Sequence, residues 1–152
     1  MSGGNGKGLA TYFKASVFHN KQDFITPHMQ ITKFCSENLD VINVYRSSKG
    51  NSLDLLNKLV EMVTPGMSTL ITGDFNICYY RNPNNRMSKG LVNAGFQQLM
   101  REPTHILGGH IDHVYWNSSY QRIWKDPVLN RHSPYYSDHD ATCITMIRQV
   151  NI

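Results

Sequence analysis

The stretch Leu70-Ile71-Thr72-Gly73-Asp74-Phe75-Asn76 decides the fold, because an apolar segment here passes directly into polar side chains. The short apolar run from Met67 to Thr72 predicts a buried strand. At its end, Asp74 and Asn76 stand two residues apart and, on extended backbone, point to the same side. A carboxylate there can hold a hard cation or accept a proton from water, and a carboxamide can orient a phosphate oxygen. Residues 73–76 fit an ordinary turn about equally well, so both interpretations stay open.

Alternating or β-branched segments on both sides of this stretch predict further strands. The expected strands are Gly8–Lys14, His28–Phe34, Leu39–Tyr45, Ile111–Trp116 and Ala141–Ile147, with Gln121–Lys125 as a weaker candidate. Because strands occur in runs with helices between them, the pattern indicates a layered α/β sandwich.

Two segments repeat apolar residues at helical spacing instead. The first helix is expected over Ser52–Val63, with Ser52 as its N-cap and Pro65-Gly66 as the turn that ends it. The second is expected over Ser88–Met100. The predicted apolar stripes are Leu53, Leu56, Leu59, Val60 and Val63 in the first helix, and Leu91, Val92, Phe96 and Leu99 in the second.

Two further polar groups flank expected strands, and each has a plain structural alternative. In Ser137-Asp138-His139 the aspartate can bind a metal and the histidine can contact a phosphate oxygen. The same three residues can also merely cap a loop. In the stretch 110–115, Asp112 can fix the orientation of a histidine. A zinc site built from His110 and His113 with His139 or His105 is disfavoured, because its spacing is not typical of zinc ligands. We expect His105 and His113 to be surface or partly buried packing residues.

The 152 residues, with 40% hydrophobic side chains, fit one folded domain, which we place at residues 8–152 after a flexible start at residues 1–7. The formal net charge of +4 favours a polyanionic partner only weakly. Cys35, Cys78 and Cys143 are far apart, so we expect buried thiols and no disulfide framework. Without a secretory signal or a membrane-length apolar run, the expectation is an intracellular protein, nuclear or cytoplasmic, with no membrane partner.

The polar groups at 73–76, 111–113 and 137–139 occur in an order that resembles the endonuclease/exonuclease/phosphatase superfamily. Val44-Tyr45-Arg46 resembles the tyrosine motif of that superfamily, although its usual following proline is replaced by serine. The stretches 95–115 and 135–141 look like nucleases of retrotransposons and other mobile elements. This resemblance implies a DNase I-like α/β (α+β) sandwich of mixed sheets flanked by helices. It also implies DNA as substrate, and Mg²⁺ or Mn²⁺ as the cofactor that assists the attack of water on phosphorus.

The resemblance also implies a role for individual residues. Asp74 would activate or orient water, and Asn76 and Tyr45 would hold the phosphate. His139 would stabilise the transition state with Asp112 as its partner, and Asp138 would be the metal ligand. The candidate contacts to the nucleic-acid backbone are Arg46, Lys49, Arg81, Arg86 and Lys89.

The sequence departs from the superfamily at its start. An Asn motif and a Glu metal-ligand motif are expected before Gly8, and neither stands there. We therefore expect a C-terminal portion of the domain that lacks its first strands, binds Mg²⁺ weakly, and pairs as a homodimer or with a complementing N-terminal half. Three functions stay open: a DNA endonuclease, an inactive binding or self-associating module, and a phosphodiesterase or phosphatase acting on lipid or inositol phosphates.

Overall fold

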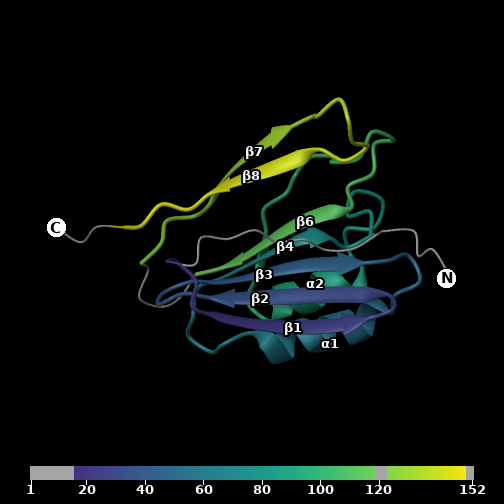
Figure 1. The fold of residues 1–152 in the computed structure, drawn as a ribbon. Coiled ribbons are helices and arrows are strands. Elements are labelled where there is room, and N and C mark those ends of the chain that lie inside the picture. Colours follow the sequence, from purple (N-terminus) through teal and green to yellow (C-terminus); the bar gives the residue numbers. More distant parts are fainter. Residues whose placement is uncertain (1–15, 119–122, 150–152) are drawn as a thin grey trace, which may run out of the picture.

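One mixed sheet organises the chain in the computed structural model, which describes residues 16–118 and 123–149 (Figure 1). Its six strands lie in the order β1-β2-β3-β4-β6-β5 within these described ranges. The strands are β1 (Asn20–Thr26), β2 (Met29–Cys35), β3 (Asp40–Arg46), β4 (Thr69–Asp74), β5 (Gln97–Gln98) and β6 (Asp112–Asn117). Strands β3 and β4 pair in parallel, and the other neighbours pair antiparallel.

Two helices cover one face of this sheet. Helix α1 (Ser52–Met62) connects the parallel strands β3 and β4, as a parallel pair requires, and α2 (Arg86–Asn93) follows β4. Both helices lie on the same side of the sheet in Figure 1. They bury a core that includes Ile31, Ile42, Val44, Leu55, Leu59, Ile71, Met87, Leu91 and Tyr115.

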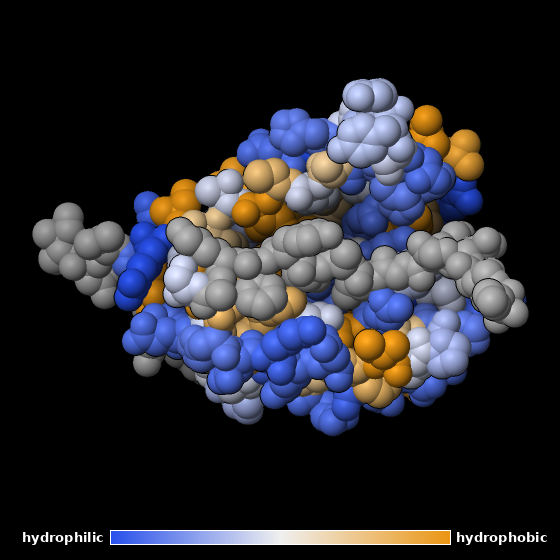
Figure 2. Space-filling view, in the orientation of Figure 1, coloured by the Kyte–Doolittle hydropathy of each residue, from blue (hydrophilic) through white to orange (hydrophobic). Residues whose placement is uncertain are grey.

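A two-stranded sheet of β7 (Val128–His132) and β8 (Ala141–Thr145) packs over the opposite face. Leu129 and Ile144 of this hairpin contact a second core cluster that contains Leu70 and Trp116 of the main sheet. Apolar side chains are visible over β7 and β8 in Figure 2. The main sheet therefore lies between a helical layer and a smaller sheet, which confirms the expected DNase I-like sandwich.

The predicted strands agree with β2, β3, β4, β6 and β8 to within a few residues. Strands β1 and β7 were not expected, because most of their side chains are exposed and leave no regular apolar alternation in the sequence. Within the weak candidate 121–125, Trp124 forms a single bridge with Arg148, and residues 121–122 lie outside the described part of the chain. The expected strand at 8–14 lies outside it as well.

The N-cap of the first helix lies one residue earlier than predicted. The N-cap is Asn51, whose side chain accepts hydrogen bonds from the N–H groups of Leu53 and Asp54, so the assignment of Ser52 was wrong. The predicted stripe was also rotated: Leu53 and Val60 are exposed. The residues that α1 buries are Leu55, Leu56, Leu59 and Met62.

The second helix is shorter than predicted. It ends at Asn93, and Gly95 takes the left-handed conformation (φ 93°) that turns the chain into β5. Phe96 is buried as predicted, but it lies in the turn after α2 and not in the helix. Val92, which was predicted on the apolar face, is exposed. A Cβ on Gly90, near the middle of α2, would lie 2.2 Å from Leu56 Cδ2 of α1. The two helices therefore pack so closely at this point that only glycine fits without a shift of Leu56.

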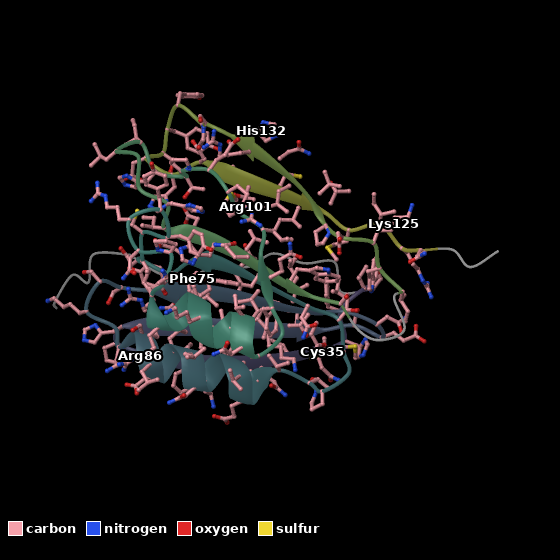
Figure 3. The ribbon with its side chains drawn as sticks, turned by 180° about the vertical axis from the view of Figure 1, so that it is seen from behind. Cys35, Phe75, Arg86, Arg101, Lys125 and His132 are labelled. Atoms are coloured by element: carbon pink, nitrogen blue, oxygen red, sulfur yellow. The ribbon has the colours of Figure 1, made fainter. Side chains whose placement is uncertain are left out.

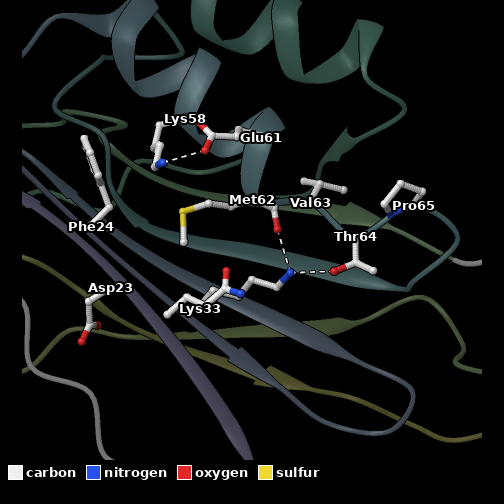
Figure 4. Close-up of a pocket in the computed structure, with 10 residues that line it drawn as sticks. Asp23, Phe24, Lys33, Lys58, Glu61, Met62, Val63, Thr64 and Pro65 are labelled. Carbon is white, nitrogen blue, oxygen red and sulfur yellow. Dashed lines mark hydrogen bonds and ion pairs between the residues drawn. The ribbon is translucent and has the colours of Figure 1, made fainter.

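A buried ion pair ties the sheet to the end of α1. Lys33 Nζ lies 3.0 Å from Asp40 Oδ2, and both side chains are almost fully buried. The same ammonium donates to the carbonyl oxygen of Met62 and to Thr64 Oγ1, each at 2.7 Å, beside a surface pocket (Figure 4). Lys33 thus neutralises Asp40 and satisfies a carbonyl at the C-terminus of the helix.

The cysteines differ from the expected buried thiols. All three are free, but Cys35 and Cys78 are only half-buried and Cys143 is exposed. Among the helices that the structure describes, none has the length and apolar character to span a membrane.

Candidate active site

Three polar side chains stand in one row across the main sheet. In the register, Tyr45 of β3 lies beside Asp74 of β4, and Asp74 lies beside Asp112 of β6. Partners in register share a face of the sheet, so the strand pairing itself gathers these three residues at one edge. The row lies where β3 and β4 end and β6 begins.

The backbone after β4 turns sharply and holds Asp74 in place. Gly73 has φ 141°, and a Cβ there would lie 1.9 Å from the carbonyl oxygen of Val44, so a side chain has no room at this position. Asn76 adopts φ 51°, and its N–H donates to Asp74 Oδ1 at 2.9 Å. Gly73 and Asp74 therefore belong to the end of strand β4, and the left-handed residue Asn76 follows them. Asp74 Oδ2 accepts no hydrogen bond from the described residues.

Arg46 fastens this turn to β3. Its Nε donates to the carbonyl oxygen of Phe75 at 2.6 Å, Nη2 to that of Asn76 at 3.0 Å, and Nη1 to that of Gly50. In return, Asn76 Nδ2 donates to the carbonyl oxygen of Arg46 at 2.8 Å. Arg46 is only 6% exposed. The expected phosphate contact of Arg46 is therefore corrected to a structural role, and the Asn76 amide group is already used within the protein.

His139 reaches the row from the loop between β7 and β8. Its Nδ1 lies 2.9 Å from Asp112 Oδ2, which also accepts a hydrogen bond from Thr104 Oγ1 at 2.6 Å. Burial alone would lower the pKa of His139, but the hydrogen bond and the charge of Asp112, with the nearby carboxylates, raise it above its ordinary value. Asp112 thus orients the imidazole and stabilises its charged form.

Asp74 completes a compact group with Asp112 and His139. One ligand atom from each of the three residues lies within 4.8 Å of the other two. Burial raises the pKa of Asp74, and the neighbouring charge of Asp112 acts in the same direction. The bond from the Asn76 N–H and the charges of His139 and Arg46 oppose this shift without cancelling it. The carboxylate of Asp74 is therefore a stronger base than an exposed aspartate.

Asp138 lies next to His105. Its Oδ2 is 3.4 Å from His105 Nε2, and these two residues form a second compact group with His139. His105 is partly buried and its ring packs on His139, as expected, but its contact with Asp138 was not predicted. The sequence gives no local sign that Thr104 and His105 belong to the site, because their partners lie in other segments of the chain. Thr104 bonds to Asp112, and an isolated bridge joins His105 to His139.

The remaining histidines of the motif are buried in the core. His113 stacks on Phe75 with ring centroids 4.9 Å apart, and its Nε2 is bonded to the carbonyl oxygen of Ile77. Burial lowers the pKa of His113 to about 4, which keeps the ring neutral. Phe75 lies inside the molecule close to α2 (Figure 3). The packing role predicted for His113 is confirmed, but the residue is fully buried rather than at or near the surface, and His110 is buried beside it.

The other candidate phosphate contacts lie on the exterior. Lys49 is exposed in the loop after β3, and Arg81 is exposed in the turn before α2. Arg86 and Lys89 are exposed on α2, and Figure 3 shows Arg86 at the edge of the helical layer. Their contact with nucleic acid stays a prediction.

The donor set fits a hard divalent cation. Asp74 Oδ2 and Asp112 Oδ1 are the oxygens of this pair that accept no hydrogen bond from the described residues. Mg²⁺ and Mn²⁺ prefer oxygen ligands, and Mg²⁺ commonly takes one or two carboxylates while keeping several waters. Asp112 Oδ1 would hold such an ion, which leaves Asp74 Oδ2 available to accept a proton.

A comparison with curated proteins finds no match to the chain. The model of the Endonuclease/Exonuclease/phosphatase family matches residues 1–139, a span that contains the whole row and ends at His139. The sandwich and the grouping of Asp74, Asp112 and His139 agree with this match. The chain belongs to the endonuclease/exonuclease/phosphatase family.

Proposed function

We propose that this chain is a divalent-metal-dependent DNA endonuclease of the kind found in mobile elements. The family suggests phosphodiester hydrolysis, and DNA as the substrate is part of the proposal. The observation that carries the proposal is the group of Asp74, Asp112 and His139, in which Asp112 Oδ2 holds His139 Nδ1 at 2.9 Å.

The residues of the site divide the reaction between them. Asp74, a partly buried carboxylate with a raised pKa, accepts a proton from the attacking water. With its Nδ1–H directed to Asp112, His139 presents Nε2–H of its charged form to a phosphate oxygen and stabilises the negative charge that develops there. Tyr45, the neighbour of Asp74 in the row, donates to the phosphate. A bound Mg²⁺ or Mn²⁺ ion would supply further charge stabilisation.

DNA is favoured over smaller phosphodiesters by the charge of the chain and by its resemblance to mobile-element nucleases. The net charge is +4, and Lys49, Arg81, Arg86 and Lys89 are exposed. Exposed cations of this kind bind the DNA backbone without regard to sequence.

The test is nicking of supercoiled plasmid in the presence of Mg²⁺ or Mn²⁺. The protein is compared with His139→Ala, Asp74→Ala and the control His132→Ala, which removes an exposed histidine of β7 outside the row. We expect nicking that the first two variants abolish and the control retains. Circular dichroism verifies that each variant is folded.

Two outcomes would contradict the proposal. A folded protein that retains DNA on a filter but never nicks it would be a binding module. A protein that releases phosphate from inositol phosphates or phospholipid vesicles and leaves plasmid intact would be a phosphatase of this family.

A further inference from the structure

We propose that His105, Asp138 and His139 form a separate metal site that selects a transition metal such as Zn²⁺ over Mg²⁺. This site is distinct from the oxygen-rich pair of Asp74 and Asp112, although it shares His139 with that pair. Its binding chemistry does not depend on the nuclease function proposed above.

The spacing of one pair of ligand atoms, His105 Nε2 and Asp138 Oδ2, fits a tetrahedral ion. His105 Nε2 and Asp138 Oδ2 lie 3.4 Å apart, and one ligand atom of each of the three residues lies within 4.8 Å of the others. Zinc binds histidine nitrogen and carboxylate oxygen at about 2.0–2.1 Å, which places two tetrahedral ligands roughly 3.3–3.4 Å from one another. The His105–Asp138 pair already has this separation.

Main-chain contacts hold the two ligand-bearing segments together. His105 and His139 form an antiparallel bridge, and the N–H of Ile106 donates to the carbonyl oxygen of Asp138 at 2.8 Å. The two imidazole rings stand nearly perpendicular, with centroids 5.0 Å apart. Little backbone rearrangement is needed before an ion binds, which favours affinity.

His139 is oriented as metal-bound histidines commonly are. Its Nδ1 is engaged by Asp112 at 2.9 Å, which leaves Nε2 as the ligand atom and supplies the carboxylate–histidine–metal arrangement. His105 must adjust more: its Nδ1 accepts the N–H of Leu107 at 3.2 Å. Binding through Nε2 requires the tautomer protonated at Nδ1, so the exposed N–H of Leu107 passes to solvent.

The donor set decides which metal is selected. Two imidazoles and one carboxylate suit Zn²⁺, Co²⁺ or Ni²⁺, whereas Mg²⁺ prefers oxygen ligands throughout. Three protein ligands leave a coordination position open, and the side chain of Asp138 is 66% exposed, so the ion has access from solvent. If the proposed function holds, a metal on His139 Nε2 removes the donor for phosphate and inhibits cleavage.

The test measures binding directly. Zn²⁺ is titrated into the full chain in competition with a chromophoric chelator, with Mg²⁺ in excess throughout, and Co²⁺ is added separately to record its visible absorption. We expect one Zn²⁺ per chain that excess Mg²⁺ does not displace, and an intense Co²⁺ spectrum typical of a tetrahedral site.

Variants assign the ligands. His105→Ala and Asp138→Ala should each weaken Zn²⁺ binding by more than the roughly 10- to 100-fold that loss of an outer partner costs. The control His132→Ala should bind as the unchanged protein does. Equal affinity in His105→Ala and the unchanged protein, with folding verified by circular dichroism, would overturn the proposal, as would displacement of Zn²⁺ by Mg²⁺. Failure of plasmid nicking would leave these binding results intact, so the two proposals fail separately.

Discussion

Replacing Asp112 by asparagine should disable His139 while leaving the sheet in place. Asp112 Oδ2 accepts from His139 Nδ1 at 2.9 Å and from Thr104 Oγ1 at 2.6 Å in a partly buried setting. Asparagine keeps the shape but loses the charge. A hydrogen bond between charged groups contributes about 1.5–3 kcal/mol. At about 1.4 kcal/mol for each factor of ten, kcat/KM of the proposed reaction should fall roughly 10- to 150-fold.

The pKa of His139 gives a readout that does not require activity. It is raised in the folded protein, so the stability that the charged pair contributes is full below the ordinary value of 6.5 and is lost as pH rises through the folded pKa. In Asp112→Asn the pKa should fall, and this part of the pH dependence of the unfolding free energy should disappear. Nuclear magnetic resonance of the imidazole protons and urea titrations at several pH values measure both effects.

Thr104→Val is the matched control for this prediction. It removes the hydrogen bond that Thr104 Oγ1 donates to the carboxylate of Asp112 and the one that it accepts from the N–H of Asp112, but it keeps the carboxylate charge beside His139. We expect its effect on the pKa of His139 to be clearly smaller than that of Asp112→Asn. If Asp112→Asn leaves that pKa where it was, the role assigned to the Asp112–His139 pair is refuted.

Two further predictions concern stability. Lys33→Met should lower the unfolding free energy by about 3–5 kcal/mol, because it leaves Asp40 buried without its cation. In urea unfolding, the double variant with Asp40→Leu should recover most of that loss, and a loss under about 1 kcal/mol for Lys33→Met would contradict the prediction. Gly73→Ala should cost at least about 2 kcal/mol, because its Cβ would collide with the carbonyl oxygen of Val44. Thermal unfolding checks this loss, and a melting temperature equal to that of the unchanged protein would show that β3 and β4 can separate there.

The sequence predicts the parts of the fold whose signals are local. Strand β3 alternates buried and half-buried residues along its length, and this pattern is visible without any partner. Strand β1 is an edge strand of the described sheet with polar, exposed residues, so nothing in its composition marks it. For α2, Phe96 and Leu99 continue the helical spacing of apolar residues past Gly95, so the sequence predicts a longer helix. In the structure the helix ends at Asn93, before the left-handed Gly95.

The candidate site divides in the same way. Asp74 and Asn76 are near neighbours, so their shared turn can be anticipated. The pairing of Asp112 with His139 is implied only by the family resemblance, because the two residues stand 27 positions apart and no local pattern links them. The contact between His105 and Asp138 depends on how two distant loops meet, and no periodicity in either loop encodes it.

The bonds of Arg46 have a consequence for how this chain can vary. Each carbonyl oxygen that accepts from its guanidinium belongs to the main chain, at Gly50, Phe75 or Asn76. Main-chain oxygens are present whatever side chain a residue carries, so the bonds to Phe75 and Asn76 do not themselves require particular side chains there. At Gly50 a Cβ would lie 2.8 Å from Arg46 Cγ and 3.0 Å from the carbonyl oxygen of His28, so this acceptor position does favour glycine. The three bonds do depend on the number of residues between β3 and Gly50 and between β4 and Asn76. Insertions and deletions in these two loops should therefore disturb the sheet edge that carries Asp74 more than substitutions at Phe75 or Asn76 that keep the backbone conformation.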